Sequence, residues 1–232
     1  MLISQKKLLL FYLTLFILIT LVSCREIYDK KYISEGSIEY KVSYLNSEEN
    51  DLVSLMPEKM LCHFKNNKVA LDLSGGMGLF RTTFIFDSDK KTFLQLVKIM
   101  QSKYAASINQ DSISYLVNEL PKLKINLKPE LKEIAGYSCK KAEVVFENPI
   151  FPSFDIYYTD DINIKNPNWC SPFNEIEGVL MEYRMKKYNM DMQITAVSVS
   201  KDDVEDEIFE LPEDFKRISL KDLDNMLLEL NP

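Results

Sequence analysis

From Gly36 onward, apolar and polar residues alternate along the chain, and this period of two most constrains what the chain can fold into. Ile38, Tyr40, Val42 and Tyr44 alternate with serine, glutamate and lysine. Successive side chains of a β-strand point to opposite faces of a sheet, so the pattern indicates a strand with one buried and one solvated face. Because the pattern recurs along the chain, we expect a mainly β body.

Short turns separate the alternating runs. Asn66-Asn67 and Asp87-Ser88-Asp89-Lys90 have the composition of tight turns, and the glycine-rich residues 75–78 break another run. A phase slip at Ala196-Val197 indicates a β-bulge. About ten strands are expected, at residues 38–44, 60–64, 69–73, 80–86, 92–97, 123–127, 142–146, 154–158, 179–185 and 190–196.

Two segments have helical spacing instead. In residues 111–120, four aliphatic residues stand at i, i+3, i+4 and i+7, with Asp111 as N-cap and Pro121 as the stop. Ser219 can cap a last helix that carries Leu220, Leu223, Leu227 and Leu230. The sequence therefore predicts a mainly β fold with a few helices (α+β). A flat sandwich and a curved antiparallel sheet or half-barrel wrapping helices both fit the pattern, and we expect the curved sheet.

The N-terminus has the features of an export signal. Lys6 and Lys7 precede an apolar run from Leu8 to Val22, which is typical of a secretory signal peptide. Residues 21–24, Leu-Val-Ser-Cys, resemble a bacterial lipobox, in which the signal is cut before the cysteine and the cysteine is acylated. We expect 1–23 to be a lipoprotein signal peptide, 24–35 a tether and 36–232 a single antiparallel-sheet domain.

This interpretation sets the location and the membrane partner. Acyl chains, such as palmitate, on Cys24 would hold the protein on a membrane, since each buried CH₂ contributes about 0.8 kcal/mol. We expect an exported lipoprotein of the bacterial cell envelope, at the outer membrane rather than the inner one.

Composition excludes several function classes. Without the signal peptide, 26 basic residues face 35 acidic ones, a net charge of −9. Such a surface repels phosphate backbones, so we expect no nucleic-acid partner. Only one long apolar run is present, which excludes a polytopic membrane protein.

The remaining candidates for chemistry are few. Cys62, Cys139 and Cys170 allow one disulfide in an oxidising compartment, or they are buried thiols that act as small hydrophobic residues. The single histidine, His63, and the absence of metal-ligand spacing lead us to expect no metal and no cofactor. Asp160-Asp161 could support acid–base chemistry, and the acidic residues 202–207 could attract calcium, but solvated turns explain both.

Apolar residues of the strands offer a binding surface. Methionine adapts to varied apolar ligands, so methionines and aromatic rings on one sheet face could line a pocket, although an ordinary core explains them too. The candidate pocket residues are Phe84, Phe86, Met181, Tyr183, Met185 and Met192.

Several blocks resemble a known family. Residues 134–142 (IAGYSCKKA), 156–162 (IYYTDDI), Pro172-Phe173 and 176–183 (IEGVLMEY), with residues 36–40 (GSIEY), resemble the GLPGLI family of uncharacterised envelope lipoproteins. Proteins of this layout are similar to lipoprotein carriers of the LolA and LolB type, in which a curved sheet wraps helices around an apolar cavity. The resemblance brings no catalytic residues with it.

Together these observations predict a non-catalytic envelope lipoprotein that binds an apolar or lipid-like ligand in a curved sheet. The alternative is a structural or protein-interaction lipoprotein with a filled core, which binds another envelope protein. A carboxylate-dependent enzyme is a distant third hypothesis. A solid core would exclude the first hypothesis.

Overall fold

A computed structural model describes residues 32–45, 56–75, 78–108, 110, 113, 117, 120–187 and 190–229. Contacts group Ser34–Pro232 as one unit, separate from Met1–Ile33. The predicted signal peptide 1–23, Cys24 and most of the tether 24–35 lie outside the described residues. Among the described helices, none is both long and apolar enough to cross a membrane.

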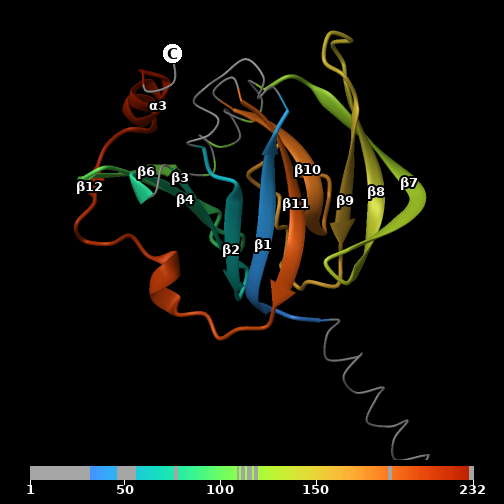
Figure 1. Ribbon diagram of the computed structural model, residues 1–232, viewed down its shortest axis with the longest axis horizontal. Coiled ribbons are helices and arrows are strands. Elements are labelled where there is room, and N and C mark those ends of the chain that lie inside the picture. The colour runs from blue at the N-terminus through green and yellow to red at the C-terminus, as the bar shows by residue number, and fades with distance from the viewer. Residues whose placement is uncertain are drawn as a thin grey trace, which may run out of the picture. The chain divides into compact units, whose positions relative to one another are not determined.

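Twelve strands form one sheet (Figure 1). Their bounds are β1 Glu35–Tyr44, β2 Lys59–Lys65, β3 Lys68–Gly75, β4 Phe80–Asp87, β5 Thr92–Ile99, β6 Ser102–Ile108, β7 Leu123–Ile134, β8 Tyr137–Phe146, β9 Phe154–Thr159, β10 Val179–Lys187, β11 Met190–Ser200 and β12 Lys216–Arg217. The order across the sheet is β12-β6-β5-β4-β3-β2-β1-β11-β10-β9-β8-β7. All pairs are antiparallel except β12 with β6. The mainly β, antiparallel prediction is therefore confirmed.

Local signals place several elements correctly. Asn66 and Asn67 have positive φ angles of 48° and 64°, which suits the two-residue hairpin turn that the sequence predicts. Tyr40 pairs with Ala196 and Glu39 with Ser198, so Val197 is the extra residue of the expected bulge. The helix α3 (Leu220–Glu229) follows Ser219, whose Oγ accepts the Asp222 N–H at 3.1 Å. In each case, a short-range physical requirement fixes the local structure.

The strand count differs from the expected ten because β6 and the two-residue β12 were not predicted. Ala105 and Ala106 of β6 are both buried, one against each face of the sheet. A strand covered on both faces loses the alternation that identifies a half-buried strand. The predicted helix at 111–120 is only partly described: Ile113 and Val117 are helical, and most of its other residues lie outside the described set.

The expectation of a curved half-barrel that wraps helices is wrong. The sheet begins at β12 and ends at β7, and among the described strands no pairing joins these two, so it stays open (Figure 1). It is also not strongly curled. Its faces are covered by an irregular loop and by C-terminal segments, so the sheet does not have to close on itself to bury its apolar side chains.

Two apolar clusters lie on opposite faces of the β3–β6 region. We call the face that carries Tyr40 and Val42 the inner face, and the face that carries Glu39 and Lys41 the outer face. On the outer face, the 3₁₀ turn η4 (Asp206–Phe209) and its flanks pack on a cluster of Ala70, Ile85, Leu96, Ala105, Val204 and Phe209. On the inner face, α3 packs Leu223 and Leu227 on Val97 and Ala106. The C-terminal segment therefore covers both sides of this region.

The close approach of β1 to the end of β11 gives a stability test. A Cβ on Gly36 would lie 2.2 Å from the carbonyl oxygen of Ser200, whereas a Cβ on Gly136 meets no atom within 4 Å but has a φ of +81°. We expect Gly36→Ala to lower the free energy of unfolding by about 3 kcal/mol, because backbone must move. Gly136→Ala, as the control, should cost about 1 kcal/mol through its φ angle alone. Urea unfolding measures both, and equal losses would contradict the close contact.

Candidate functional site

The six candidate pocket residues share one face of the sheet. Tyr183 pairs with Ile194, Ile194 with Val42, and residues paired across antiparallel strands lie on the same face. The same step from strand to strand places the β4 residues on that inner face. The set comprises Phe84 and Phe86 on β4, Met181, Tyr183 and Met185 on β10, and Met192 on β11.

The structure does not bring these six residues into one group. β3, β2, β1 and β11 separate the β4 pair from β10. Phe86, Met181, Tyr183 and Met192 are buried, and Phe84 is half-buried with its ring 6.1 Å from that of Phe93. Met185 is 38% exposed. The set therefore comprises two separate parts of a core and one surface residue.

A row of aromatic rings crosses the inner face near β10. The Tyr40 ring meets the Tyr183 ring edge-on at 6.4 Å, and Phe173 lies 6.4 Å from Tyr183 and 6.2 Å from Phe154. Edge-to-face rings at these distances attract each other beyond the gain from burial. Phe173 belongs to the irregular residues 160–178, which we call the covering loop. Its buried ring stands on the face where a ligand pocket was expected.

Asn168 holds the covering loop in its folded form. Its side chain is buried, and Nδ2 donates to the carbonyl oxygens of Ile176 at 2.7 Å and Gly178 at 2.9 Å. Ser171 Oγ donates to the Asn168 carbonyl at 3.0 Å and accepts the Phe173 N–H at 3.1 Å. A loop on an apolar face must satisfy its own backbone groups, and these hydrogen bonds do so beside Phe173.

The middle of the covering loop reaches the turns of the distant strands. The Lys165 N–H donates to Asn67 Oδ1 in the β2–β3 turn at 2.9 Å. Ser88 Oγ, in the β4–β5 turn, donates to the Asn166 carbonyl at 3.3 Å, and Lys165 Nζ lies 3.2 Å from Asp89 Oδ1. The covering loop is thus fixed both at the β9–β10 side and at the β2–β5 side.

The three cysteines of the body are free thiols. Cys62 and Cys139 are buried in β2 and β8, and Cys170 lies half-buried in the covering loop. Burial raises the pKa of Cys62 to about 12, of Cys139 to about 11 and of Cys170 to about 12. A thiol that stays protonated is a poor nucleophile and a poor metal ligand. Here the thiols serve as small apolar residues.

The carboxylates proposed for chemistry have structural partners. Asp160 pairs with Lys140, and Asp202 accepts a hydrogen bond from Ser37 Oγ at 2.6 Å. Asp206 lies 3.8 Å from Lys65 Nζ, where it helps to fasten η4 to β2. Within the part of the chain that the structure describes, no group of three or more His, Cys, Asp or Glu residues could hold a metal ion. His63 lies half-buried on the outer face, opposite to Cys62.

The outer face of β7 to β10 carries a ladder of charges that sequence reasoning missed. Lys132 Nζ on β7 lies 2.7 Å from Glu182 Oε2 on β10 and 4.7 Å above the Tyr157 ring. Lys128 Nζ lies 2.8 Å from Glu143 Oε2 on β8. Lys124, Lys128 and Lys132 are visible in the sequence at every fourth position, but the partners of such lysines depend on strand order.

Alkaline pH should weaken the fold. Burial raises the pKa of both Cys62 and Tyr44 to about 12, above their ordinary values of about 8.5 and 10. The unfolded chain loses these protons first, so it binds fewer protons than the native state, and the free energy of unfolding falls as pH rises from about 8.5 to 12. Urea unfolding at successive pH values measures the slope. Cys139 and Cys170 contribute to the fall below pH about 10 in the same way, since burial raises their pKa values too. Cys62→Ala should therefore reduce the slope in that range by about a third, and an unchanged slope in that variant would contradict this assignment.

Comparison with known proteins corrects the family assignment. Residues 38–223, from β1 into α3, match the family described as N-glycanase peptide, N-terminal domain. No curated protein matches the chain. The resemblance to the GLPGLI family and to carriers of the LolA and LolB type is therefore wrong.

The misleading blocks have a structural explanation. Gly136 takes a positive φ in the β7–β8 hairpin, and a Cβ on Gly178 would lie 2.7 Å from Thr159 O and Asp160 Oδ1. Such glycines meet requirements that unrelated antiparallel sheets share. The match over four-fifths of the sequence carries more weight, and the chain belongs to the N-glycanase peptide, N-terminal domain family.

Proposed function

We propose that this chain is a non-catalytic interaction domain with a filled core, anchored to the bacterial envelope through acylated Cys24. It would hold a protein partner that acts in N-glycan processing. The covering loop is the main support for the proposal, because its Phe173 packs against both Phe154 and Tyr183 on the face where a ligand was expected. A side chain that is already enclosed by protein leaves its face little room for a ligand.

The family description supports the glycan context of this proposal. It names an N-terminal domain of an N-glycanase, and on this ground we place the partner in N-glycan processing. Of the carboxylates considered for acid–base chemistry, Asp160 pairs with Lys140. Of those considered for calcium, Asp202 accepts a hydrogen bond from Ser37 and Asp206 lies near Lys65. A domain of this kind contributes surface, and its partner supplies the reaction.

Carriage of an apolar or lipid-like ligand is the second candidate. Met181 and Met192 lie buried on the inner face near the aromatic row, where their flexible side chains could adapt to a ligand. That function requires the covering loop to leave the face. Such a movement of the loop would break the hydrogen bonds of Asn168 and expose Phe173.

Apolar binding by the intact chain and by Phe173→Ala tests the filled core. We expect native mass spectrometry of the gently extracted protein to show no lipid, and an environment-sensitive apolar dye to stay dark. Phe173→Ala should lose about 3–5 kcal/mol of unfolding free energy and bind the dye, because it opens a cavity. Phe151→Ala is the matched control, since that ring is 36% exposed and its removal opens no cavity. Stoichiometric lipid on the wild type would contradict a filled core.

Membrane partition tests the anchor. Replacing Cys24 removes the only thiol next to the predicted cleavage site, so a Cys24→Ala chain should appear unprocessed or in the soluble fraction. Cell fractionation with mass spectrometry of the mature N-terminus measures both outcomes. Cys170→Ala serves as the control and should partition as the wild type does. If Cys24→Ala partitions unchanged, the lipoprotein assignment fails.

A further inference from the structure

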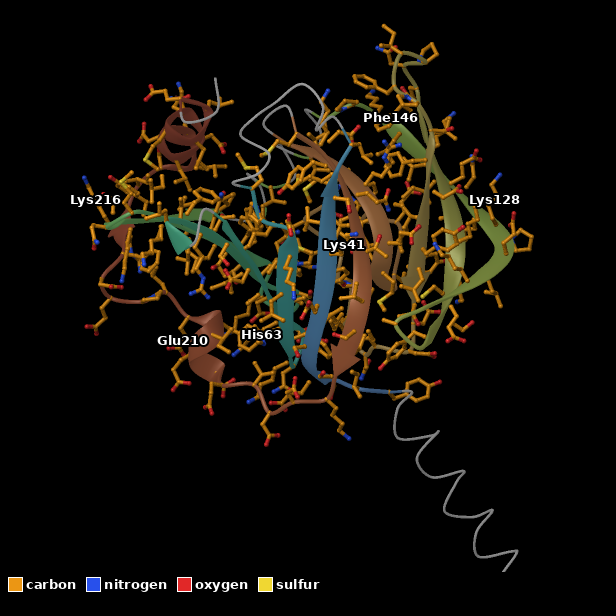
Figure 2. The ribbon with its side chains drawn as sticks, in the orientation of Figure 1. Lys41, His63, Lys128, Phe146, Glu210 and Lys216 are labelled. Atoms are coloured by element: carbon orange, nitrogen blue, oxygen red, sulfur yellow. The ribbon has the colours of Figure 1, made fainter. Side chains whose placement is uncertain are left out.

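The two edges of the sheet differ in how they end. At one edge, the two-residue β12 is the last strand and pairs with β6, and Lys216 marks this edge in Figure 2. At the other edge stands β7, a strand of 12 residues that pairs with β8 on one side only among the described strands. Figure 2 labels Lys128 on this outermost strand. A long edge strand offers unpaired backbone groups to another chain.

The first half of β7 is the regular part. From Leu123 to Lys128 the register with β8 is unbroken, and an irregularity that contains Pro129 follows before Leu131. Proline cannot donate a backbone hydrogen bond, so it limits strand addition at its own position. The usable edge is therefore residues 123–128.

Hydrogen bonding at the start of β7 fixes which backbone groups face outward. The Glu147 N–H donates to the Lys122 carbonyl at 2.9 Å. In an antiparallel ladder, bonded pairs alternate with non-bonded pairs. Lys124 and Asn126 therefore bond to β8, and the N–H and C=O groups of Leu123, Ile125 and Leu127 point to the open edge.

The side chains of this edge specify the chemistry of a partner. Leu123, Ile125 and Leu127 lie on the inner face, paired with Phe146, Val144 and Ala142. Leu127 is 68% exposed, although its partner Ala142 is fully buried. Lys124, Asn126 and Lys128 lie on the outer face. Lys128 already pairs with Glu143 of β8 at 2.8 Å, so Lys124 is the main charge that a partner can meet. A strand beside this edge would need apolar residues opposite the first set and an acidic residue opposite Lys124.

Charge argues against a second copy of this chain as that strand. Self-pairing centred on Asn126 would place Lys124 opposite Lys128 of the second copy. Pairing centred on Ile125 would place Lys128 opposite Lys122. Like charges directly opposite each other destabilise a sheet, so the lysines disfavour both of these pairings and favour an acidic partner.

We propose that residues 123–128 of β7 bind an extended segment of a partner protein in which acidic and apolar residues alternate, and that this segment adds an antiparallel strand to the sheet. The inference rests on the proposed function as an interaction domain and names the surface that performs it. Backbone hydrogen bonds give the affinity, and alternate side chains give the specificity.

A capped peptide of alternating glutamate and valine is the probe, and a lysine–valine peptide of equal length is its counterpart. We expect the full-length protein to bind the glutamate–valine peptide saturably and to show no binding of the lysine–valine peptide. Binding should slow hydrogen exchange at Leu123, Ile125 and Leu127. The amides of Lys124 and Asn126, already bonded to β8, should not change. Diffuse electrostatic attraction would not produce this alternation.

Two variants and a control complete the test. Leu127→Pro removes an outward N–H without removing a bond to β8, and it should abolish binding. Lys124→Glu should weaken binding by about tenfold, because it replaces an attraction between exposed charges by a repulsion between exposed charges. This variant keeps the test valid if the proline variant unfolds. Lys90→Glu, an exposed charge in the β4–β5 turn, should bind as the wild type does.

Several results would overturn the proposal. These are no saturable binding, equal binding of the lysine–valine peptide, no alternation in amide protection, or a concentration-dependent dimer in sedimentation that Leu127→Pro abolishes. The proposed function is tested separately: release of glycan from an N-glycosylated peptide by this chain alone would contradict a non-catalytic role, whatever the result at β7.

Discussion

The buried side chain of Asn168 is the interaction on which the inner face depends. Its amide donates to the carbonyls of Ile176 and Gly178 and so satisfies a loop that would otherwise bring unpaired polar groups onto an apolar surface. Once the loop is held in this form, Phe173 can pack on Tyr183 and Phe154. A single open sheet has no second sheet to cover it, so the loop supplies the second layer there.

The other end of the sheet solves the same problem with the C-terminal segment. That segment leaves β11, crosses the outer face through η4, pairs briefly as β12 and returns over the inner face as α3. Lys65 fastens the first part of this path, since its ammonium group donates to the Val204 carbonyl at 2.7 Å and pairs with Glu35 at 3.2 Å. Because both faces of the β3–β6 region are covered, the surface available for recognition is the outer face of β7 to β10 and the β7 edge. This arrangement supports the proposal of an interaction domain.

The alternation of residues predicted most strands because half-buried strands obey a short-range rule. Ile38, Tyr40 and Val42 are buried as the pattern requires, and Val197 forms the bulge that the phase slip indicated. Prediction failed where burial is two-sided or long-range. In β6, Ala105 and Ala106 contact different clusters, so the pattern vanishes. The candidate pocket shows the second failure: its residues share a face, but the strand order places β4 far from β10.

The sequence by itself determined ten of the strands, the hairpin turns and the α3 cap, since each depends on residues close together in the chain. It also predicts an export signal. The tertiary structure alone decided that the sheet stays open, that residues 160–178 cover its inner face and that β7 stands at an edge. These features depend on contacts between distant segments, such as Asn67 with Lys165 and Lys132 with Glu182. Local periodicity carries no record of such contacts, because it reports which side of a strand is buried but not what buries it.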